Sequence, residues 1–268
     1  MRRITLHRLL TCCIAAVLLF LGYTPASSQY YMNVFKKNGE IVQFAVAELD
    51  SVYYTSSGVT PTPSGQYEYV DLGLSVNWAT LNVGASKPEE YGIYYAWGET
   101  EPKRSYSWSD YKFNSGGSTI NDVMFSKYNT SSNYGQVDNK TVLDPEDDVA
   151  HVIWGGNWRM PTKAEWDELY SNCTWTWYAS GNSEFGGMAG YKVTGKKSGH
   201  TDRYIFLPAV GCRERHQHEG VGSEGIYWSS SLSEDYPDGA YMLFFESVES
   251  GVDEEDRYVG LPVRPVCP

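Results

Sequence analysis

Short runs of apolar and β-branched residues recur along residues 170–268, separated by Gly, Asn, Ser and Asp. The runs are CTWTWY, GYKVTG, RYIFLPAVG, GIYWSSS, GAYMLFFES and GLPVRPV. This pattern is typical of short β-strands joined by loops. Within residues 190–207, two such runs flank the segment KKSGHTD, which predicts a β-hairpin.

One segment repeats apolar residues at helical spacing after an aspartate and a proline. Asp144 is the expected N-cap and Pro145 the first helical residue, with two acids following in the first turn, where carboxylates favour the helix dipole. Val149, Val152 and Ile153 form the expected apolar stripe. The acids therefore have a structural explanation and need no catalytic role.

A second helix is expected after Thr162. Thr162 and Glu165 have the spacing of a capping box, in which each side chain binds the backbone N–H of the other residue. Trp166, Leu169 and Tyr170 form one apolar face of this helix.

The chain divides into segments of different composition. Residues 29–54 hold two strand-like runs around Asn38-Gly39, a dipeptide favoured in tight hairpin turns, and predict a small β unit. Residues 55–66 are rich in Ser, Thr, Gly and Pro and predict a linker. Residues 67–268 form the main domain, which we expect to be α+β, with short strands, two helices and long loops.

The N-terminal residues have the pattern of a secretory signal peptide. Three arginines, Arg2, Arg3 and Arg8, precede an apolar run over residues 9–21, and small residues surround the expected cleavage after Ser28. That run is shorter than the roughly 20 residues of a membrane-spanning helix. We predict a signal peptide over residues 1–28, a secreted or cell-surface protein, and no membrane insertion.

Charge and cysteine content limit the partners and the chemistry. The chain has a formal net charge of −12, and loss of the three signal-peptide arginines makes it −15. Such a chain repels phosphate backbones, so nucleic acid is not an expected partner. Cys173, Cys212 and Cys267 remain after cleavage, too far apart for a redox or zinc pair, and we expect one disulfide or none.

Four ordered blocks resemble a known family. They are VDLGLSVNWATLNVGASKPEEYGIYYAWGE, WGGNWRMPTKAEWDEL, IYWSSS and VRPV. Together, over roughly residues 67–266, they resemble the Fibrobacter succinogenes major paralogous domain of secreted bacterial proteins, akin to the DUF1566 or Lcl-type domain. The block WRMPTKAEW is also similar to a signature of the formylglycine-generating enzyme family. The resemblance implies a C-type lectin-like fold.

The shared block does not by itself indicate catalysis. Pro161 fixes the backbone, Thr162 caps the helix and Trp166 anchors it, so these residues serve folding, and fold does not imply function. The formylglycine-generating reaction needs a closely placed cysteine pair that acts with copper, and this sequence has none. Cations near Cys212 would lower the pKa of its thiol. We expect no enzyme activity and no cofactor.

Two segments offer metal ligands without a complete ligand set. His216 and His218 lie two residues apart beside Glu214 and Glu219, a spacing that suits either a divalent metal on a strand or a solvated loop. The acidic runs near the C-terminus offer the oxygen ligands that Ca²⁺ prefers, but the tripeptides by which C-type lectins bind calcium and sugar are absent. No metal is predicted.

Recognition is the function that remains, through the loops SLSEDYPDGAY and ESVESGVDEEDRY. In related lectin-like folds, ligands contact loops around the last strands, and these two combine aromatic side chains with carboxylates. The alternatives are ordinary polar hairpin tips or, at the level of the whole protein, a structural or tip subunit of a surface appendage. The expected partner is a glycan or a surface protein. The candidate ligand-binding residues are Asp235, Tyr236, Asp238, Tyr241, Glu249, Asp253, Glu254 and Tyr258.

Overall fold

The computed structural model describes the strands Ala16–Leu18, Tyr31–Phe35 and Ile41–Ala45 and all of residues 67–268. Contacts within the chain divide it into two units, Met1–Thr60 and Pro61–Pro268. The predicted linker, residues 55–66, lies outside the described residues, as does the predicted signal peptide, residues 1–28, apart from Ala16–Leu18.

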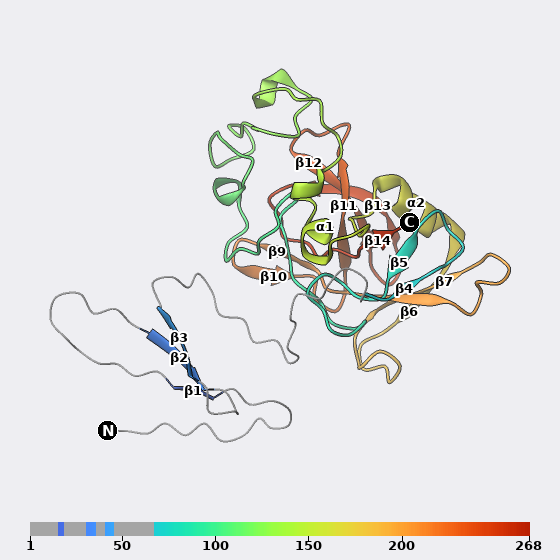
Figure 1. Cartoon of the computed structure of the whole chain (residues 1–268). Coiled ribbons are helices and arrows are strands. Elements are labelled where there is room, and N and C mark those ends of the chain that lie inside the picture. Colours follow the sequence, from blue (N-terminus) through green and yellow to red (C-terminus); the bar gives the residue numbers. More distant parts are fainter. Residues whose placement is uncertain (1–15, 19–30, 36–40, 46–66) are drawn as a thin grey trace. The chain divides into compact units, whose positions relative to one another are not determined.

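The described residues of the first unit form three short antiparallel strands. Strand β1 (Ala16–Leu18) pairs with β2 (Tyr31–Phe35), and β2 pairs with β3 (Ile41–Ala45), in the order β1-β2-β3 (Figure 1). The β2–β3 pair matches the two strand-like runs in the sequence. Strand β1 was not expected, because its residues lie in the apolar run assigned to the signal peptide.

The second unit is an α+β domain in which strands from its beginning and its end pair in one small sheet. Strand β5 (Asn77–Ala79) pairs with β4 (Tyr69–Val70) on one side and with the C-terminal β14 (Val266–Cys267) on the other. The sequence predicted a longer terminal strand over GLPVRPV. The prediction was too long, because Leu261 makes only an isolated bridge to Tyr95 and two prolines interrupt the segment.

The first helix differs from its prediction. Residues Pro145–Asp147 form a 3₁₀ helix, and α1 (Val149–Trp154) begins only after Asp148, whose carboxylate accepts a hydrogen bond from the His151 N–H. The expected cap, Asp144, makes no capping hydrogen bond. The buried residues of α1 are Val149, Ala150 and Trp154, whereas Val152 and Ile153 of the expected stripe are exposed.

The second helix confirms its prediction. Helix α2 (Lys163–Asn172) begins at Thr162 with a complete capping box to Glu165. Trp166 and Leu169 are buried, although Tyr170 of the expected face is 41% exposed. No helix in the described part of the chain is both long and apolar enough to cross a bilayer.

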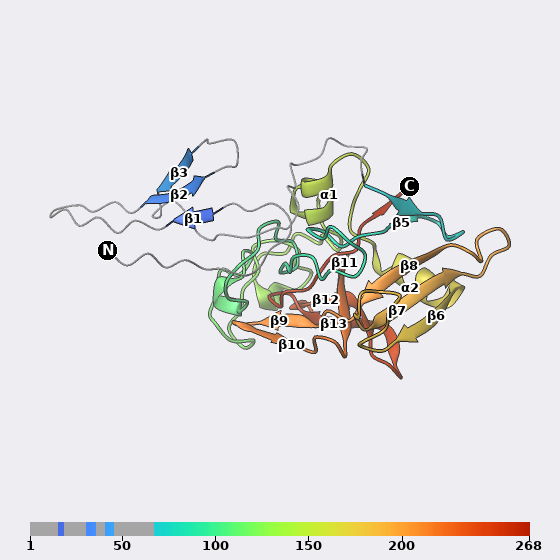
Figure 2. The ribbon, with the colours of Figure 1, turned by 90° about the horizontal axis from the view of Figure 1, so that it is seen from below.

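Two three-stranded antiparallel sheets build the centre of the domain. The first contains β6 (Cys173–Tyr178), β7 (Gly190–Gly195) and β8 (Tyr204–Pro208), and it includes the predicted hairpin (Figure 2). The second contains β11 (Gly225–Leu232), β12 (Gly239–Phe245) and β13 (Ser250–Asp256). A small hairpin, β9 (Cys212–Glu214) with β10 (Gln217–Glu219), lies between them in sequence.

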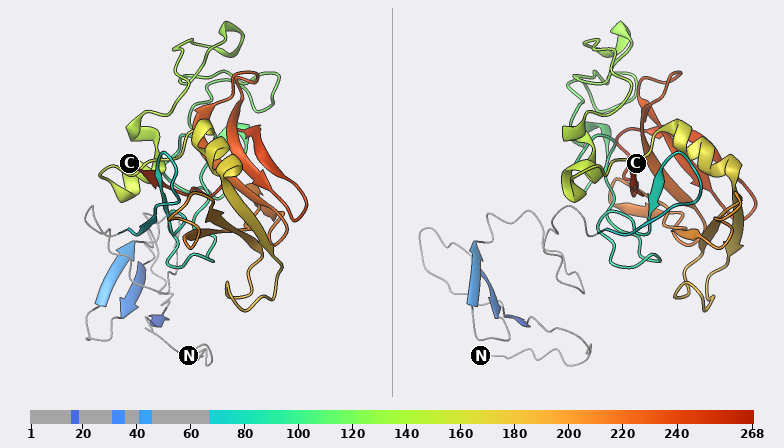
Figure 3. Two further views of the ribbon diagram at one scale, coloured as in Figure 1. Left: turned by 90° about the vertical axis from the view of Figure 1, so that its right-hand side faces the viewer. Right: turned by 45° about the vertical axis from the view of Figure 1, so that its right-hand side comes forward.

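Helix α2 lies against the second sheet (Figure 3). The Trp166 side chain is fully buried, and its indole N–H donates to the Trp228 carbonyl of β11 at 3.2 Å. Rings of the first sheet, including Trp175 and Tyr191, pack on Phe245 of β12. The residues that the shared sequence block predicted to serve folding therefore do so.

Most aromatic side chains of residues 67–268 are buried in the core. The segment between β5 and α1 has little regular structure, with 3₁₀ helices at Trp108–Asp110 and Ser132–Tyr134. It is held by large buried rings, among them Trp97, Trp108, Tyr111, Phe125 and Tyr128. Packing between rings, together with side-chain hydrogen bonds such as those of Asn114 and Asp138, holds this segment, which has little helix or strand hydrogen bonding.

Two buried arginines attach the C-terminal segment to this core. The Arg257 guanidinium donates to the Tyr111 hydroxyl and to three backbone carbonyls, and it lies 4.2 Å from the Phe125 ring centre. The Arg264 guanidinium donates to the Asn82 side chain and to three backbone carbonyls. Burial lowers the pKa of Arg264 to about 10. Both arginines are satisfied by dipoles and need no carboxylate.

Candidate functional site

Four consecutive acidic residues lie on an edge strand. The sequence placed this run, Asp253 to Asp256, in a loop, and the structure corrects that expectation, because the run forms the second half of β13. The partner strand β12 supplies the pairing, with Tyr241 opposite Glu254. Successive side chains of a strand point to opposite faces, so the acids alternate between the two faces of the sheet.

The loop between β11 and β12 is organised by Ser233. Its buried hydroxyl accepts hydrogen bonds from the N–H groups of Asp235 (3.2 Å) and Tyr236 (3.0 Å). The same hydroxyl donates to the Glu254 carboxylate at 3.2 Å. One side chain therefore holds the loop beside the acidic end of β13.

This loop presents an aromatic ring next to carboxylates. Tyr236 is 60% exposed, and Asp235 is exposed beside it. Burial, together with the charges of Asp253 and Asp235, raises the pKa of Glu254. The hydrogen bond from Ser233 lowers this pKa but does not offset the effect of burial and of the neighbouring acids.

A second group of acids surrounds the end of β13. Burial and the charges of Asp238 and Glu214 raise the pKa of Asp256 to about 6. The pKa of Glu255 is raised by burial and then by the charges of Asp256, Glu214 and Asp253. These groups repel one another at neutral pH.

No cation offsets this charge within the described residues. None of the ion pairs found in residues 67–268 includes these carboxylates. We call this surface the acidic edge. It consists of Glu214, Asp235, Tyr236, Asp238, Asp253, Glu254, Glu255 and Asp256.

Three predicted residues do not contribute exposed groups to the acidic edge. Glu249 lies in the turn between β12 and β13, at the opposite end of the strand from Asp256. Tyr241 is only 8% exposed, and the Lys163 ammonium lies 5.1 Å from its ring centre. Tyr258 is half-buried against the Trp108 ring, 4.8 Å between ring centres.

Sequence reasoning missed Glu214 and Ser233. Glu214 ends β9, and Arg213 beside it exchanges backbone hydrogen bonds with Gly260, just beyond β13. That bridge brings Glu214 to the acidic edge, where it accepts a hydrogen bond from the Tyr258 hydroxyl at 3.0 Å. No local sequence signal reports such a pairing, because the two segments are distant in the chain.

The histidine and cysteine candidates do not form a reactive centre. His216 Nδ1 lies 3.1 Å from the Arg104 carbonyl oxygen, whereas the His218 ring packs on Tyr94, 5.1 Å between ring centres. Burial and the charges of nearby glutamates, Glu255 first, raise the pKa of Cys212 to about 12. The expectation that cations lower this pKa was wrong, because burial, and after it the nearby carboxylates, raise it. All three cysteines in residues 67–268 are free thiols.

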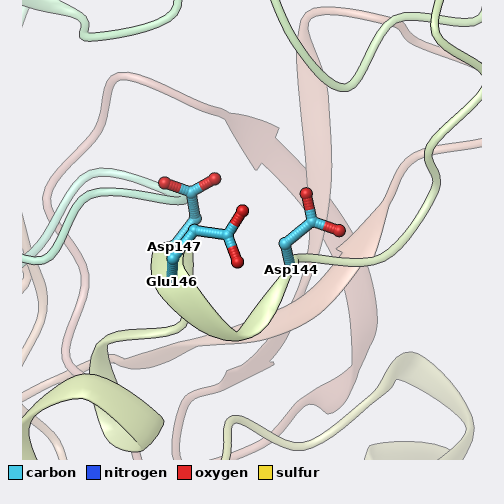
Figure 4. A group of neighbouring side chains, drawn as sticks. All are labelled: Asp144, Glu146 and Asp147. Carbon is cyan, nitrogen blue, oxygen red and sulfur yellow. The ribbon is translucent and has the colours of Figure 1, made fainter.

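A separate acidic group has the geometry of a cation site. The carboxylates of Asp144, Glu146 and Asp147 surround one space (Figure 4) and lie within 4.8 Å of one another. The Lys127 ammonium contacts all three, at 2.6, 3.3 and 2.5 Å. Lys140 pairs with Asp144, and Lys112 pairs with Asp147 at 2.7 Å.

These lysines neutralise the group. The pKa of Asp144 is lowered by Lys127 and Lys140. Burial acts to raise the pKa of Asp147, but hydrogen bonds from Lys112 and Lys127 lower it overall. An ammonium thus occupies the position that a metal ion would take, and the group stabilises the fold.

A shallow groove lies at the C-terminal end of α2. Its volume is about 390 Å³, and it is lined by Leu72, Gly73, Leu74, Glu168, Asn172, Lys196 and Lys197. The Glu168 carboxylate is already engaged there, because it accepts hydrogen bonds from the Ser75 N–H and hydroxyl. The groove therefore presents two lysines and an amide but no free carboxylate.

The acidic edge can offer carboxylate acceptors and one exposed ring to a ligand. Such a set suits hydrogen-bond donors, cationic groups and flat apolar faces. Comparisons of the chain with models of known protein families, with curated proteins and with solved structures gave no match.

Proposed function

We propose that this chain is an exported, non-enzymatic recognition protein that binds a glycan or protein ligand through the acidic edge. One observation carries the proposal. Glu254, Glu255 and Asp256 of the acidic edge have raised pKa values and no ion-pair partner among the described residues, and Ser233 holds Glu254 beside the loop that carries the exposed Tyr236. Charges left uncompensated in the free protein are available to a partner.

A basic protein surface suits this site better than a neutral glycan. A cationic partner relieves the repulsion of Glu255 and Asp256 by the acids around them, so binding lowers the pKa values of these two carboxyls. Exposed charges also steer association and raise its rate at low salt. A neutral glycan neither relieves the repulsion between the carboxylates nor is steered by their charge, so its binding depends on stacking with Tyr236.

The fold and the export in this proposal rest on the sequence. The four blocks support a C-type lectin-like domain, and the observed α+β arrangement of two helices and short antiparallel strands agrees with it at a coarser level. The arginines and apolar run at the N-terminus support export through a signal peptide.

The test begins with the ligand. The protein lacking residues 1–28 is screened against glycan and surface-protein arrays, with and without a chelator. For a protein partner, association is then measured at two salt concentrations for Asp253→Ser. Glu249→Ser is the matched control, because it removes one exposed acid from the other end of the same hairpin.

The two variants are expected to differ. Asp253→Ser slows association and reduces its salt dependence, whereas Glu249→Ser leaves both close to those of the unaltered chain. For a glycan, Tyr236→Ala abolishes most of the affinity and the acid variants have little effect. Equal effects of Asp253→Ser and Glu249→Ser, or no effect of any of the three changes, would place the site elsewhere.

A further inference from the structure

Strand β6 is an edge strand whose outer side has no strand partner among residues 67–268. It pairs with β7 over six residues without a register shift, from Cys173 opposite Gly195 to Tyr178 opposite Gly190. The sheet order β6-β7-β8 leaves its other side open, and Figure 2 shows β6 on the outside of this sheet. Such an edge exposes backbone N–H and C=O groups that can pair with another chain.

Strands β6 and β13, each at one edge of its own three-stranded sheet, differ in how they are protected. Proteins commonly block edges with charged residues, proline or a bulge. Strand β13 carries the acidic run Asp253 to Asp256. Strand β6, with the sequence CTWTWY, has no charge, no proline and no bulge. Only β13 therefore carries one of these barriers to strand pairing.

The side chains of β6 are ordered before any partner arrives. Trp175 packs on Tyr191 at 5.4 Å between ring centres, and Trp177 packs on the same ring at 5.1 Å. Both tryptophans remain partly exposed on this face. On the other face Thr174 and Thr176 are exposed. Prior ordering reduces the entropy cost of adding a strand.

We propose that β6 pairs with the β6 strand of a second copy of this chain, antiparallel about a twofold axis, to give one continuous six-stranded sheet. A twofold axis pairs a surface with itself. The alternation Thr-Trp-Thr-Trp suits self-pairing, because antiparallel neighbours opposite each other share a face. With the axis at Thr176, Trp175 lies opposite Trp177 of the second copy and the two Thr176 side chains meet.

Charge limits pairing between two copies of the chain to uncharged surface such as β6. The chain has a formal net charge of −12, so two copies repel each other over most of their surface. The uncharged β6 strand avoids adding like charges at the contact itself. A partner of opposite charge is drawn instead to the acidic edge, which includes β13.

The test is sedimentation velocity of the full chain over a concentration series. The unaltered chain is expected to change from monomer to dimer as its concentration rises. Thr176→Lys places two like charges opposite each other at the axis and weakens dimerisation about tenfold or more. The matched control, Thr130→Lys, adds the same charge at an exposed loop position and leaves the dimerisation constant unchanged.

Three results overturn the proposal: a monomer at every concentration, a dimer unaffected by Thr176→Lys, or equal weakening by both variants. Near-UV circular dichroism confirms that each variant is folded, and Thr174→Lys replaces Thr176→Lys if the latter does not fold. Hydrogen exchange gives an independent measurement. Outward-facing amides of β6 are expected to gain protection with concentration, whereas amides of β13 are not.

Discussion

Two groups of acidic residues in this domain have opposite electrostatics. The first, which we call the Asp144 group, consists of Asp144, Glu146 and Asp147. Its Asp147 is 4% exposed, contacts two lysines and accepts a hydrogen bond from the Tyr128 hydroxyl at 2.7 Å. Its pKa is lowered. At the acidic edge, Asp256 has no cation partner among the described residues, and burial beside other acids raises its pKa to about 6.

The difference shows that pairing, and not residue type, separates a structural carboxylate from one available to a ligand. Both groups are runs of acids that look alike in the sequence. The Asp144 group is neutralised by Lys112, Lys127 and Lys140 and holds the start of the α1 region to the loop before it. The acidic edge retains its charge, at a cost in stability that a cationic partner would relieve.

The largest expected loss of stability comes from a change in the Asp144 group, whose carboxylates are paired with lysines. Asp147→Ala removes the partner of Lys112, Lys127 and Tyr128 together, and it should lower the free energy of unfolding by about 2 to 3 kcal/mol. Urea denaturation measures this loss. A change within about 0.5 kcal/mol of zero, typical of an exposed surface position, would remove the distinction between the two groups.

A smaller loss is expected at the acidic edge from the serine that organises its loop. Ser233→Ala deletes the hydroxyl that binds Asp235, Tyr236 and Glu254, and it should cost about 1 kcal/mol. Hydrogen exchange at Asp235 and Tyr236 should become faster. Unchanged exchange at both amides would mean that the loop does not depend on Ser233.

The smallest expected change in stability, that of Asp256→Asn, is a gain and not a loss. The pKa of Asp256 is about 6 in the folded chain against an ordinary 3.8, so the folded state binds more protons between these values. Stability therefore falls as pH rises through this window. Asp256→Asn should reduce that fall and raise the melting temperature at pH 7. A lower melting temperature at pH 7, with an unchanged pH dependence, would argue that Asp256 is a paired structural residue.

The elements predicted correctly depend on neighbours in sequence. The capping box of Thr162 and Glu165 and the β7–β8 hairpin are local patterns that predict their own structure. The predicted start of the first helix was wrong, because Asp144 pairs with lysines and does not cap a helix. Asp148, four residues later, caps α1.

The candidate site was predicted only in part because it depends on distant segments. Four consecutive acids disfavour a strand, yet β13 forms because β12 supplies its pairing partner. The family resemblance pointed to the loops around the last strands, and their composition then identified Asp235, Tyr236, Asp238, Asp253 and Glu254 as candidates. It could not show that Tyr241 is buried, that Glu249 lies at the far end of the hairpin, or that Glu214 reaches Asp256.

The central claim is tested most directly by an NMR pH titration of the side-chain carboxyl carbons of Asp256 and Asp147 in the same sample. We predict a pKa of about 6 for Asp256 and a pKa below 3.8 for Asp147. A pKa at or below 3.8 for both residues would show that the acidic edge is compensated within the protein, and would contradict its assignment as a surface that binds a ligand.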